Sequence, residues 1–161
     1  MFYLVLFLLT ILLTYLVRLY AIKKTILDIP NSRSSHTTPT PKGGGIAIIF
    51  TFYMAVVYFY YNNEIDQKLF FLILSSIPIM ITGLIDDLIV LKWKFRMIIQ
   101  TLSAVLAVYI LGGIQNIDFI LFEFNGWWLN LFAILSIIWF INLFNFLDGI
   151  DGYAGSQAVI A

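Results

Sequence analysis

Cysteine is absent from this 161-residue sequence, and histidine occurs only once, at His36. The absence of cysteine excludes disulfide bonds, thiolate-bound zinc and a cysteine nucleophile. One histidine is too few for a metal site built from several histidines of this chain. Lys plus Arg and Asp plus Glu number nine each, so the formal net charge is zero. The chain lacks the positive excess with which proteins attract nucleic acid, and no nucleic-acid partner is expected.

Charge of either sign is also scarce. Charged residues make up 11% of the chain and hydrophobic residues 61%, whereas soluble domains have about 25% and about 45–50%. A soluble fold this small cannot hide so many apolar side chains, but a bilayer accepts them on the outside. Several runs contain no charged residue, and each can hold a transmembrane helix of about 17–25 residues: 1–17, 43–63, 69–85, 97–117 and 124–147.

These runs predict an all-α fold, a polytopic transmembrane helix bundle in which residues 1–161 form a single membrane domain. We expect about five full helices and the start of a sixth near Gly152. The first run is expected to be an uncleaved anchor. Its positive charges follow it, at Arg18, Lys23 and Lys24, and do not precede it as they would in a signal peptide.

The distribution of basic residues predicts the topology. All Lys and Arg residues except Lys68 lie in alternate connections between the apolar runs. The positive-inside rule places these connections in the cytoplasm, and hence the N-terminus outside. Cytoplasmic loops are therefore expected near residues 18–45, 86–97 and 145–152, the last of them by alternation.

The outer connection between residues 117 and 128 has two interpretations. Its residues alternate weakly between apolar and polar and include Asn125-Gly126, a pair typical of hairpin turns. The side chains of Trp127 and Trp128 also suit the interfacial aromatic belt of a membrane protein. A small outer β-hairpin and an aromatic belt are both compatible with this stretch.

Polar residues gather in the three expected cytoplasmic segments. The first segment, residues 28–45, contains three prolines that prevent a regular helix. It ends in glycines, including Gly43 and Gly44, which let a ligand approach the backbone closely. Its candidate anion-binding side chains are those of Arg33, His36 and Lys42. The alternative is an ordinary polar loop with positive charge beside the membrane.

The second segment contains an aspartate pair, Asp86-Asp87, directly after an apolar run. Adjacent carboxylates repel each other, which favours a shared cation or separate partners. On a helix they would point about 100° apart, so one can face a site while the other faces solvent. The alternative is a pair of solvated acids that form ion pairs with the basic residues Lys92, Lys94 or Arg96.

The third segment repeats an amide or a carboxylate at every third position, at Asn142, Asn145, Asp148 and Asp151. Steps of three residues drift by about 60° on a helix, so the first three of these residues can share a face. Such a cluster of oxygen ligands suits a hard cation, namely Mg²⁺. Helix-end capping by Asn and Asp is the alternative, and it accounts for one or two of the four residues.

Together the three segments resemble a known family, the polyprenyl-phosphate N-acetylhexosamine-1-phosphate transferases of glycosyltransferase family 4. These enzymes initiate O-antigen, enterobacterial common antigen and teichoic acid linkage units, and the lipid I translocase is a more distant relative. The matching motifs are Asp28-Ile-Pro-Asn-x-Arg33-x-x-His36 running into Pro41-x-Gly43-Gly44, the pair Asp86-Asp87, and Asn142-x-x-Asn145-x-x-Asp148-Gly149-x-Asp151-Gly152.

The resemblance implies a reaction and a location. A membrane polyprenyl phosphate, undecaprenyl phosphate in bacteria, attacks the β-phosphorus of a UDP-N-acetylhexosamine. UMP leaves, and a polyprenyl-diphospho-sugar remains. The implied location is the bacterial inner (cytoplasmic) membrane, with the active site on the cytoplasmic face of a multi-pass protein. The reaction would be the first membrane step of cell-envelope polysaccharide synthesis, and a homodimer is a further expectation.

The resemblance also implies a cofactor and residue roles. Mg²⁺ is the expected cofactor, with Mn²⁺ as its substitute; Asp148 is the expected ligand, with Asp86 or Asp87 close to the metal or the attacking phosphate. The lipid phosphate is mostly ionised at neutral pH, so positioning and charge neutralisation outweigh a base role for Asp86. The expected substrate-binding residues are Asn142, Asn145, Asp151, Arg33, His36, Lys42, Gly43 and Gly44.

Two features refine this expectation. The first segment is most similar to the O-antigen-initiating members, which favours UDP-N-acetylglucosamine or a 6-deoxy-N-acetylhexosamine as the donor. Members of the family are about twice as long and have a later cytoplasmic loop, rich in His and basic residues, that helps to bind substrate. The chain by itself is therefore expected to be inactive or nearly so.

The remaining alternatives belong to other classes. An intramembrane prenyltransferase also uses Mg²⁺ and aspartates, but its DDxxD pattern fails here because position 90 is Val. A transporter fragment would carry acids along a path through the bilayer, whereas these acids lie at predicted loop boundaries. A non-catalytic remnant of a transferase is the third alternative, and UMP release distinguishes it from an active enzyme.

Overall fold

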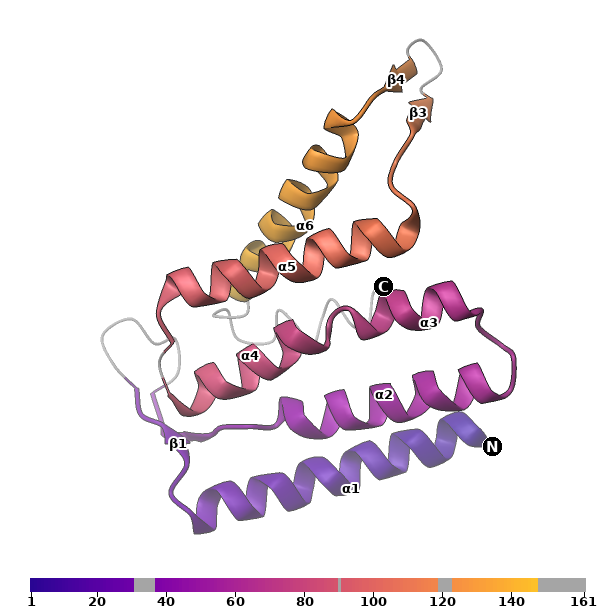
Figure 1. The fold of residues 1–161 in the computed structure, drawn as a ribbon. Coiled ribbons are helices and arrows are strands. Elements are labelled where there is room, and N and C mark those ends of the chain that lie inside the picture. The colour runs from indigo at the N-terminus through magenta and orange to yellow at the C-terminus, as the bar shows by residue number, and fades with distance from the viewer. Residues whose placement is uncertain (31–36, 90, 119–122, 148–161) are drawn as a thin grey trace. The chain divides into compact units, whose positions relative to one another are not determined.

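Helices dominate the structure, a computed structural model that describes residues 1–30, 37–89, 91–118 and 123–147 (Figure 1). The elements are α1 (Phe2–Lys23), β1 (Leu27–Asp28), β2 (Thr40–Pro41), α2 (Gly45–Tyr61), α3 (Gln67–Leu74), α4 (Ile77–Leu88), α5 (Trp93–Leu111), β3 (Asn116–Asp118), β4 (Glu123–Asn125) and α6 (Trp128–Leu147). Strands in the described part of the chain are two or three residues long, so the expected all-α class is confirmed.

The chain divides into two compact units. One unit is Met1–Phe70 with Gly83–Val90, and the other is Phe71–Thr82 with Leu91–Ala161.

Apolar side chains on the helices are widely exposed. In α1, Phe7 is 62% exposed and Ile11 is 52% exposed. The helical stretches long and apolar enough to cross a membrane are Phe2–Lys23, Gln67–Leu88, Trp93–Leu111 and Trp128–Leu147, and α2 adds a shorter apolar helix of 17 residues. Apolar surface that the protein does not cover belongs in lipid. The chain is therefore a membrane protein with several spanning helices.

In the first unit, α1 and α2 lie side by side and antiparallel (Figure 1). Phe2 near the N-terminus stacks on Tyr58 near the end of α2, with ring centroids 3.7 Å apart. Farther along, Thr10 Oγ1 lies 3.0 Å from Thr51 Oγ1. Ala47 and Thr51, one turn apart on α2, are both buried. Such small residues let two helix backbones approach closely within lipid.

The Thr10 and Thr51 hydroxyls also bond to their own helices. Thr10 Oγ1 donates to the Leu6 carbonyl at 2.8 Å, and Thr51 Oγ1 lies 3.0 Å from the carbonyls of both Ala47 and Ile48. No water is present in the bilayer core to pair with a hydroxyl, so a polar side chain there needs partners within the protein. Each hydroxyl has a single hydrogen, so one threonine donates to the other and the second donates to a carbonyl of its own helix, and this contact links the helices.

Three helices end in the same backbone motif. After α1, α2 and α5, the residues Thr25, Asn63 and Gly112 adopt positive φ angles of 55°, 57° and 85°. The following N–H then bonds to a carbonyl five residues back, from Ile26 to Ala21, Glu64 to Phe59 and Gly113 to Val108. This Schellman-type ending pairs carbonyls that the helix leaves open.

The apolar run 69–85 was expected to form one helix, but it is interrupted at Ser75-Ser76, between α3 and α4. Each serine hydroxyl donates to a carbonyl three residues back, Ser75 to Leu72 and Ser76 to Ile73, at 2.6 Å in both cases. Pro78 follows in the first turn of α4 and has no N–H to donate. Hydroxyls thus pair with backbone carbonyls where the regular helical ladder is broken.

In the second unit, α5 and α6 are joined through the outer hairpin. β3 pairs with β4 in antiparallel register, with Ile117 opposite Phe124. A hairpin, one of the two interpretations of this stretch, is therefore present, but Asn125-Gly126 is not its turn. Asn125 pairs with Asn116 as the last residue of β4, and Gly126, with φ of 116°, leads into α6. There Trp128 Nε1 donates to the Asn125 carbonyl at 2.9 Å.

A side chain from α6 also supports the start of the hairpin. Asn130 Oδ1 accepts the backbone N–H of Ile114 at 2.6 Å. Gly113, with φ of 75°, lies against the same amide: a Cβ added there would be 3.0 Å from Asn130 Oδ1. The end of α5 and the beginning of α6 are thus held together at this end of the unit.

Because α1 packs closely on α2, we expect stability to depend on the size of the side chain at Ala47, which is 2% exposed. An Ala47→Leu variant should lose about 1–3 kcal/mol of stability, because the added methylenes have no space. Ile48 is 59% exposed, so Ile48→Ala should be nearly neutral. Thermal unfolding in detergent measures both. Equal melting temperatures for the two variants would contradict this packing.

In the second unit, Gly113→Ala should lower the free energy of unfolding by about 1–2 kcal/mol, because alanine disfavours the left-handed backbone conformation. The contact of the added Cβ with Asn130 should lower it further. Gly45→Ala is the matched control, because Gly45 has no positive φ and no atom of the described residues lies within 4 Å of its added Cβ. Unfolding of the purified chain in detergent tests the pair. A Gly113→Ala variant as stable as the control would show that Gly113 is not required.

Candidate functional site

The structure describes only some of the residues that the sequence predicts for the site. Lys42, Gly43, Gly44, Asp86, Asp87, Asn142 and Asn145 are described, whereas Arg33, His36, Asp148 and Asp151 lie outside the described residues.

The first polar segment is held at its two ends. β1 and β2 pair antiparallel, with Leu27 opposite Pro41 and Asp28 opposite Thr40. Lys42 adds a backbone bond, donating its N–H to the Ile26 carbonyl at 3.1 Å. The prolines exclude helix here as expected, but the short ladder was not foreseen. It brings together residues that are 12 to 16 positions apart in the sequence.

Lys42 has an acidic partner across this ladder. Its Nζ lies 3.2 Å from Asp28 Oδ1, and the two side chains are 36% and 44% exposed. A pair this exposed contributes little to stability, so the ammonium group can exchange its partner. Sequence reasoning quoted Asp28 within the motif but assigned no role to its side chain. Only the antiparallel register of β1 and β2 reveals the pairing.

The glycines that follow Lys42 differ in their roles. Gly43 has φ of 89°, and its added Cβ would lie 3.5 Å from Ile46 Cδ1, so its backbone conformation favours glycine. Gly44 has helical angles and precedes α2 without a side-chain cap. No atom of the described residues lies within 4 Å of an added Cβ at Gly44. The beginning of α2 is thus open, and its first backbone N–H groups are not covered by a capping side chain.

The aspartate pair lies within a helix. The sequence suggested that Asp86 and Asp87 come directly after an apolar helix, whereas they occupy the last turn of α4, which ends at Leu88. Asp86 is half-buried and Asp87 is exposed. Neighbours on a helix point about 100° apart, which accounts for this difference and gives the two carboxylates separate environments.

Asn142 and Asn145 lie in the last turns of α6, which ends at Leu147, immediately before Asp148 in the sequence. Asn145 is exposed. Asn142 Nδ2 donates to Gln100 Oε1 on α5 and to the Ile138 carbonyl, at 2.8 Å in each case. Gln100 was missed by sequence reasoning. Its only signal was an amide inside an otherwise apolar run, with nothing to indicate its partner.

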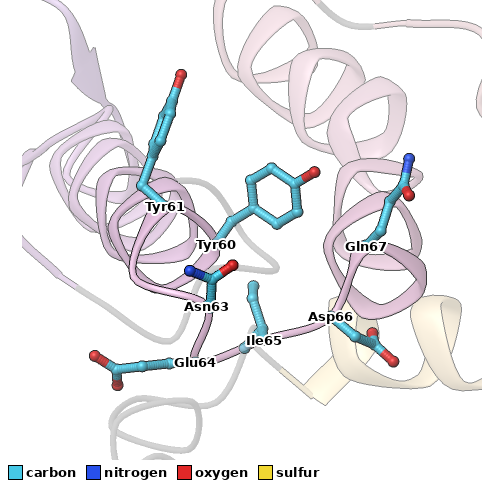
Figure 2. Close-up of a pocket in the computed structure, with 7 residues that line it drawn as sticks. All are labelled: Tyr60, Tyr61, Asn63, Glu64, Ile65, Asp66 and Gln67. Atoms are coloured by element: carbon cyan, nitrogen blue, oxygen red, sulfur yellow. The ribbon is translucent and has the colours of Figure 1, made fainter.

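A pocket in the described residues is lined by other side chains. The pocket in Figure 2 has a volume of about 490 Å³ and lies in the connection from α2 to α3, lined by Tyr60, Tyr61, Asn63, Glu64, Ile65, Asp66 and Gln67. Its two acids point in opposite directions, and Asp66 Oδ1 accepts the Leu69 N–H at 2.7 Å. This pocket lies at the far end of α2 from Gly44, so it is separate from the start of that helix.

Comparison with known proteins provides the family. The model of Glycosyl transferase family 4 matches residues 69–161, more than half of the chain. The match includes Asp86, Asp87 and the segment that begins at Asn142. No solved structure matches the chain.

Curated relatives resemble the chain over most of its length. It is 30% identical to the undecaprenyl-phosphate alpha-N-acetylglucosaminyl 1-phosphate transferase of Thermotoga maritima, over 87% of this chain and 42% of that protein. The protein of the same name from Salmonella typhi is 32% identical over 96% of this chain and 42% of its own length. The phospho-N-acetylmuramoyl-pentapeptide-transferase of Thermotoga petrophila is 30% identical over 72% of this chain and 39% of its own length.

The chain thus spans less than half the length of these relatives. The family match and the motif residues within it agree with the resemblance inferred from the sequence. The chain belongs to glycosyl transferase family 4.

Proposed function

We propose that this chain is part of an enzyme that transfers an N-acetylhexosamine 1-phosphate from a UDP-linked donor to a polyprenyl phosphate and releases UMP. The observation that supports this most strongly is the family match over residues 69–161, which contains the aspartate pair and the polar row at the end of α6. Relatives over the same region are named as transferases of this kind.

The proposed reaction forms one P–O bond and breaks another. An oxygen of the lipid phosphate attacks the β-phosphorus of the donor. The bond from that phosphorus to the oxygen bridging the two phosphates breaks, and UMP leaves with that oxygen. Both reactants are anionic, so the protein must position them and offset their mutual repulsion. The basic, amide and carboxylate side chains of the three polar segments are suited to this task.

The beginning of α2 is proposed to hold a phosphate group. Its uncapped N–H groups and the positive end of the helix dipole attract anions. Open space beside Gly44 allows close approach to the backbone, and Lys42 lies next to it in the sequence with an ion pair exposed enough to exchange partners. Arg33 and His36 are proposed to add further donors from the same segment.

Magnesium is proposed as the cofactor, with Mn²⁺ as its substitute. Within the described residues no group of three or more His, Asp or Glu side chains could hold a metal ion. Asp86 and Asp148 are proposed as its ligands, because carboxylate oxygens are the donors that a hard cation prefers. When bound, the ion would neutralise phosphate charge. Asp87, Asn142, Asn145 and Asp151 are proposed to orient the substrates.

The proposed setting is the cytoplasmic face of a bacterial inner membrane, where cell-envelope polysaccharide synthesis, including that of lipopolysaccharide O-antigen, begins. UDP-N-acetylglucosamine is the preferred candidate donor, since two of the relatives bear the name of that sugar. A homodimer is proposed as well. The basic residues of the connections support the orientation through the positive-inside rule.

The proposal is tested by UMP release from UDP-N-acetylglucosamine in membranes that contain the chain, with added undecaprenyl phosphate and Mg²⁺. A chimera in which the chain replaces the matching part of the Thermotoga maritima relative provides a full-length context. Asp148→Asn should lower release by about 100-fold or more, because it would remove a carboxylate ligand of the proposed Mg²⁺ ion, which offsets the phosphate charge. Release that persists without Mg²⁺, or in the Asp148→Asn chimera, would contradict the proposal.

Lys42 provides a second test. If its ammonium group binds substrate phosphate, Lys42→Gln should raise the KM for the UDP-sugar about tenfold or more, because a hydrogen bond to a charged group contributes about 1.5–3 kcal/mol. Asp28→Asn removes the partner but keeps the ammonium group, so it should change KM less than twofold. Lys68→Gln, in the connection predicted to be outside, is the control. Equal effects of Lys42→Gln and Asp28→Asn would assign the pair a purely structural role.

A further inference from the structure

α5 buries polar side chains on a face that is otherwise small and apolar. Gln100 is 8% exposed and Ser103, one turn later, is 4% exposed. Ala104 and Val108 continue the same buried face. Polar groups inside apolar helices are costly unless paired, and paired groups there often mark a functional requirement. Gln100 is paired with α6, whereas Ser103 Oγ is buried with no hydrogen-bond partner among the described residues.

The orientation of the Asn142 amide follows from its two contacts. The Ile138 carbonyl can only accept, so the group facing it at 2.8 Å must be Nδ2. The second N–H of the same nitrogen then points to Gln100 Oε1, also at 2.8 Å. Both hydrogens of Nδ2 are used within the protein. Asn142 Oδ1 is the remaining polar atom of this side chain, and no described residue donates a hydrogen bond to it.

This contact joins the early part of α5 to the late part of α6. Asn142 lies in the last two turns of α6, and Asn145 lies one step of three residues farther along, offset by about 60°. Residues three positions apart on one helix rotate together about the helix axis. Holding Asn142 against α5 therefore fixes the direction in which Asn145 points, and the direction in which the chain leaves α6 toward Asp148.

We infer that Gln100 is a positioning residue, whose side-chain carbonyl fixes the rotation of the α6 end and so the polar row that begins at Asn142. As a statement about catalysis, this rests on the proposed function. Gln100 itself acts through Asn142 and touches no substrate in this account. Asn142 keeps one acceptor, Oδ1, for a donor group of the nucleotide sugar, while its nitrogen is occupied by the protein.

The first test does not depend on activity. The chain has no cysteine, so Asn145→Cys introduces a single thiol at an exposed position. Labelling of this thiol by a water-soluble maleimide, in membranes containing the whole chain, reports where the end of α6 points. Adding Gln100→Leu should slow labelling by about threefold or more, the factor that an interhelical hydrogen bond contributes in membrane proteins.

Ser103→Ala is the matched control, because it removes a buried hydroxyl on the same face that has no partner among the described residues. It should leave the labelling rate unchanged within measurement error. Equal labelling in the Gln100→Leu and Ser103→Ala backgrounds would overturn the inference. This result would stand whether or not the chain releases UMP.

The second test uses UMP release and a second variant at Gln100. Gln100→Leu should lower kcat/KM for the UDP-sugar about tenfold, while KM for the lipid phosphate stays unchanged. Gln100→Glu keeps a side-chain oxygen acceptor of the same length for Asn142 Nδ2, and should retain most of the activity. A purely structural role would instead reduce the amount of folded protein and leave both KM values unchanged.

The two tests separate the claims. Loss of UMP release in the unmodified chimera contradicts the proposed function, while slowed labelling in Gln100→Leu still supports the positioning role. Normal kcat/KM in a well-folded Gln100→Leu chimera overturns the catalytic part of the inference. A Gln100→Glu chimera that is as impaired as Gln100→Leu, although it folds, overturns the role of the Gln100 side-chain oxygen as the acceptor for Asn142.

Discussion

Lipid offers no hydrogen bonds, so a polar group within a spanning helix is costly unless it has a partner inside the protein. Ser103 has no such partner among the described residues, but other polar groups of the described helices find partners in different ways. Thr10 and Thr51 bridge α1 and α2, Ser75 and Ser76 pair with carbonyls at the break before α4, and Gln100 pairs with Asn142. Each solution also restricts how a helix turns or ends. The same bonds that make the helices compatible with lipid therefore direct the polar helix ends.

Those helix ends are where the proposed chemistry is located. Asp86 and Asp87 lie in the last turn of α4, and Asn145 lies in the last turn of α6. The start of α2, which has no side-chain cap among the described residues, follows Lys42 closely in the sequence. A transferase acting on a lipid phosphate and a soluble nucleotide sugar needs its polar groups at the membrane boundary, because one substrate comes from each phase. Spanning helices that end in polar residues fulfil this need without burying unpaired charge.

The sequence predicted the class of fold, the approximate spans and the polar segments, because charge-free runs and basic loops depend on composition alone. A hairpin was one of two interpretations of residues 117–128, and Asn125-Gly126 is not its turn, because strand register depends on pairing and not on one dipeptide. The break at Ser75-Ser76 and the pairing of Asp28 with Lys42 were missed. Gln100 was missed as well, since its role depends on a residue 42 positions away. Expectations for Arg33, His36, Asp148 and Asp151 remain predictions.

The central claim is that these polar helix ends bind a nucleotide sugar together with a divalent cation. Calorimetric titration of the purified chain in detergent with UDP-N-acetylglucosamine, with and without Mg²⁺, tests this claim most directly. The account predicts saturable binding that requires Mg²⁺ and that is lost when Asp86 is replaced by Asn. Binding of equal affinity without Mg²⁺ and with Asp86→Asn, or no binding by the folded chain at all, would contradict it.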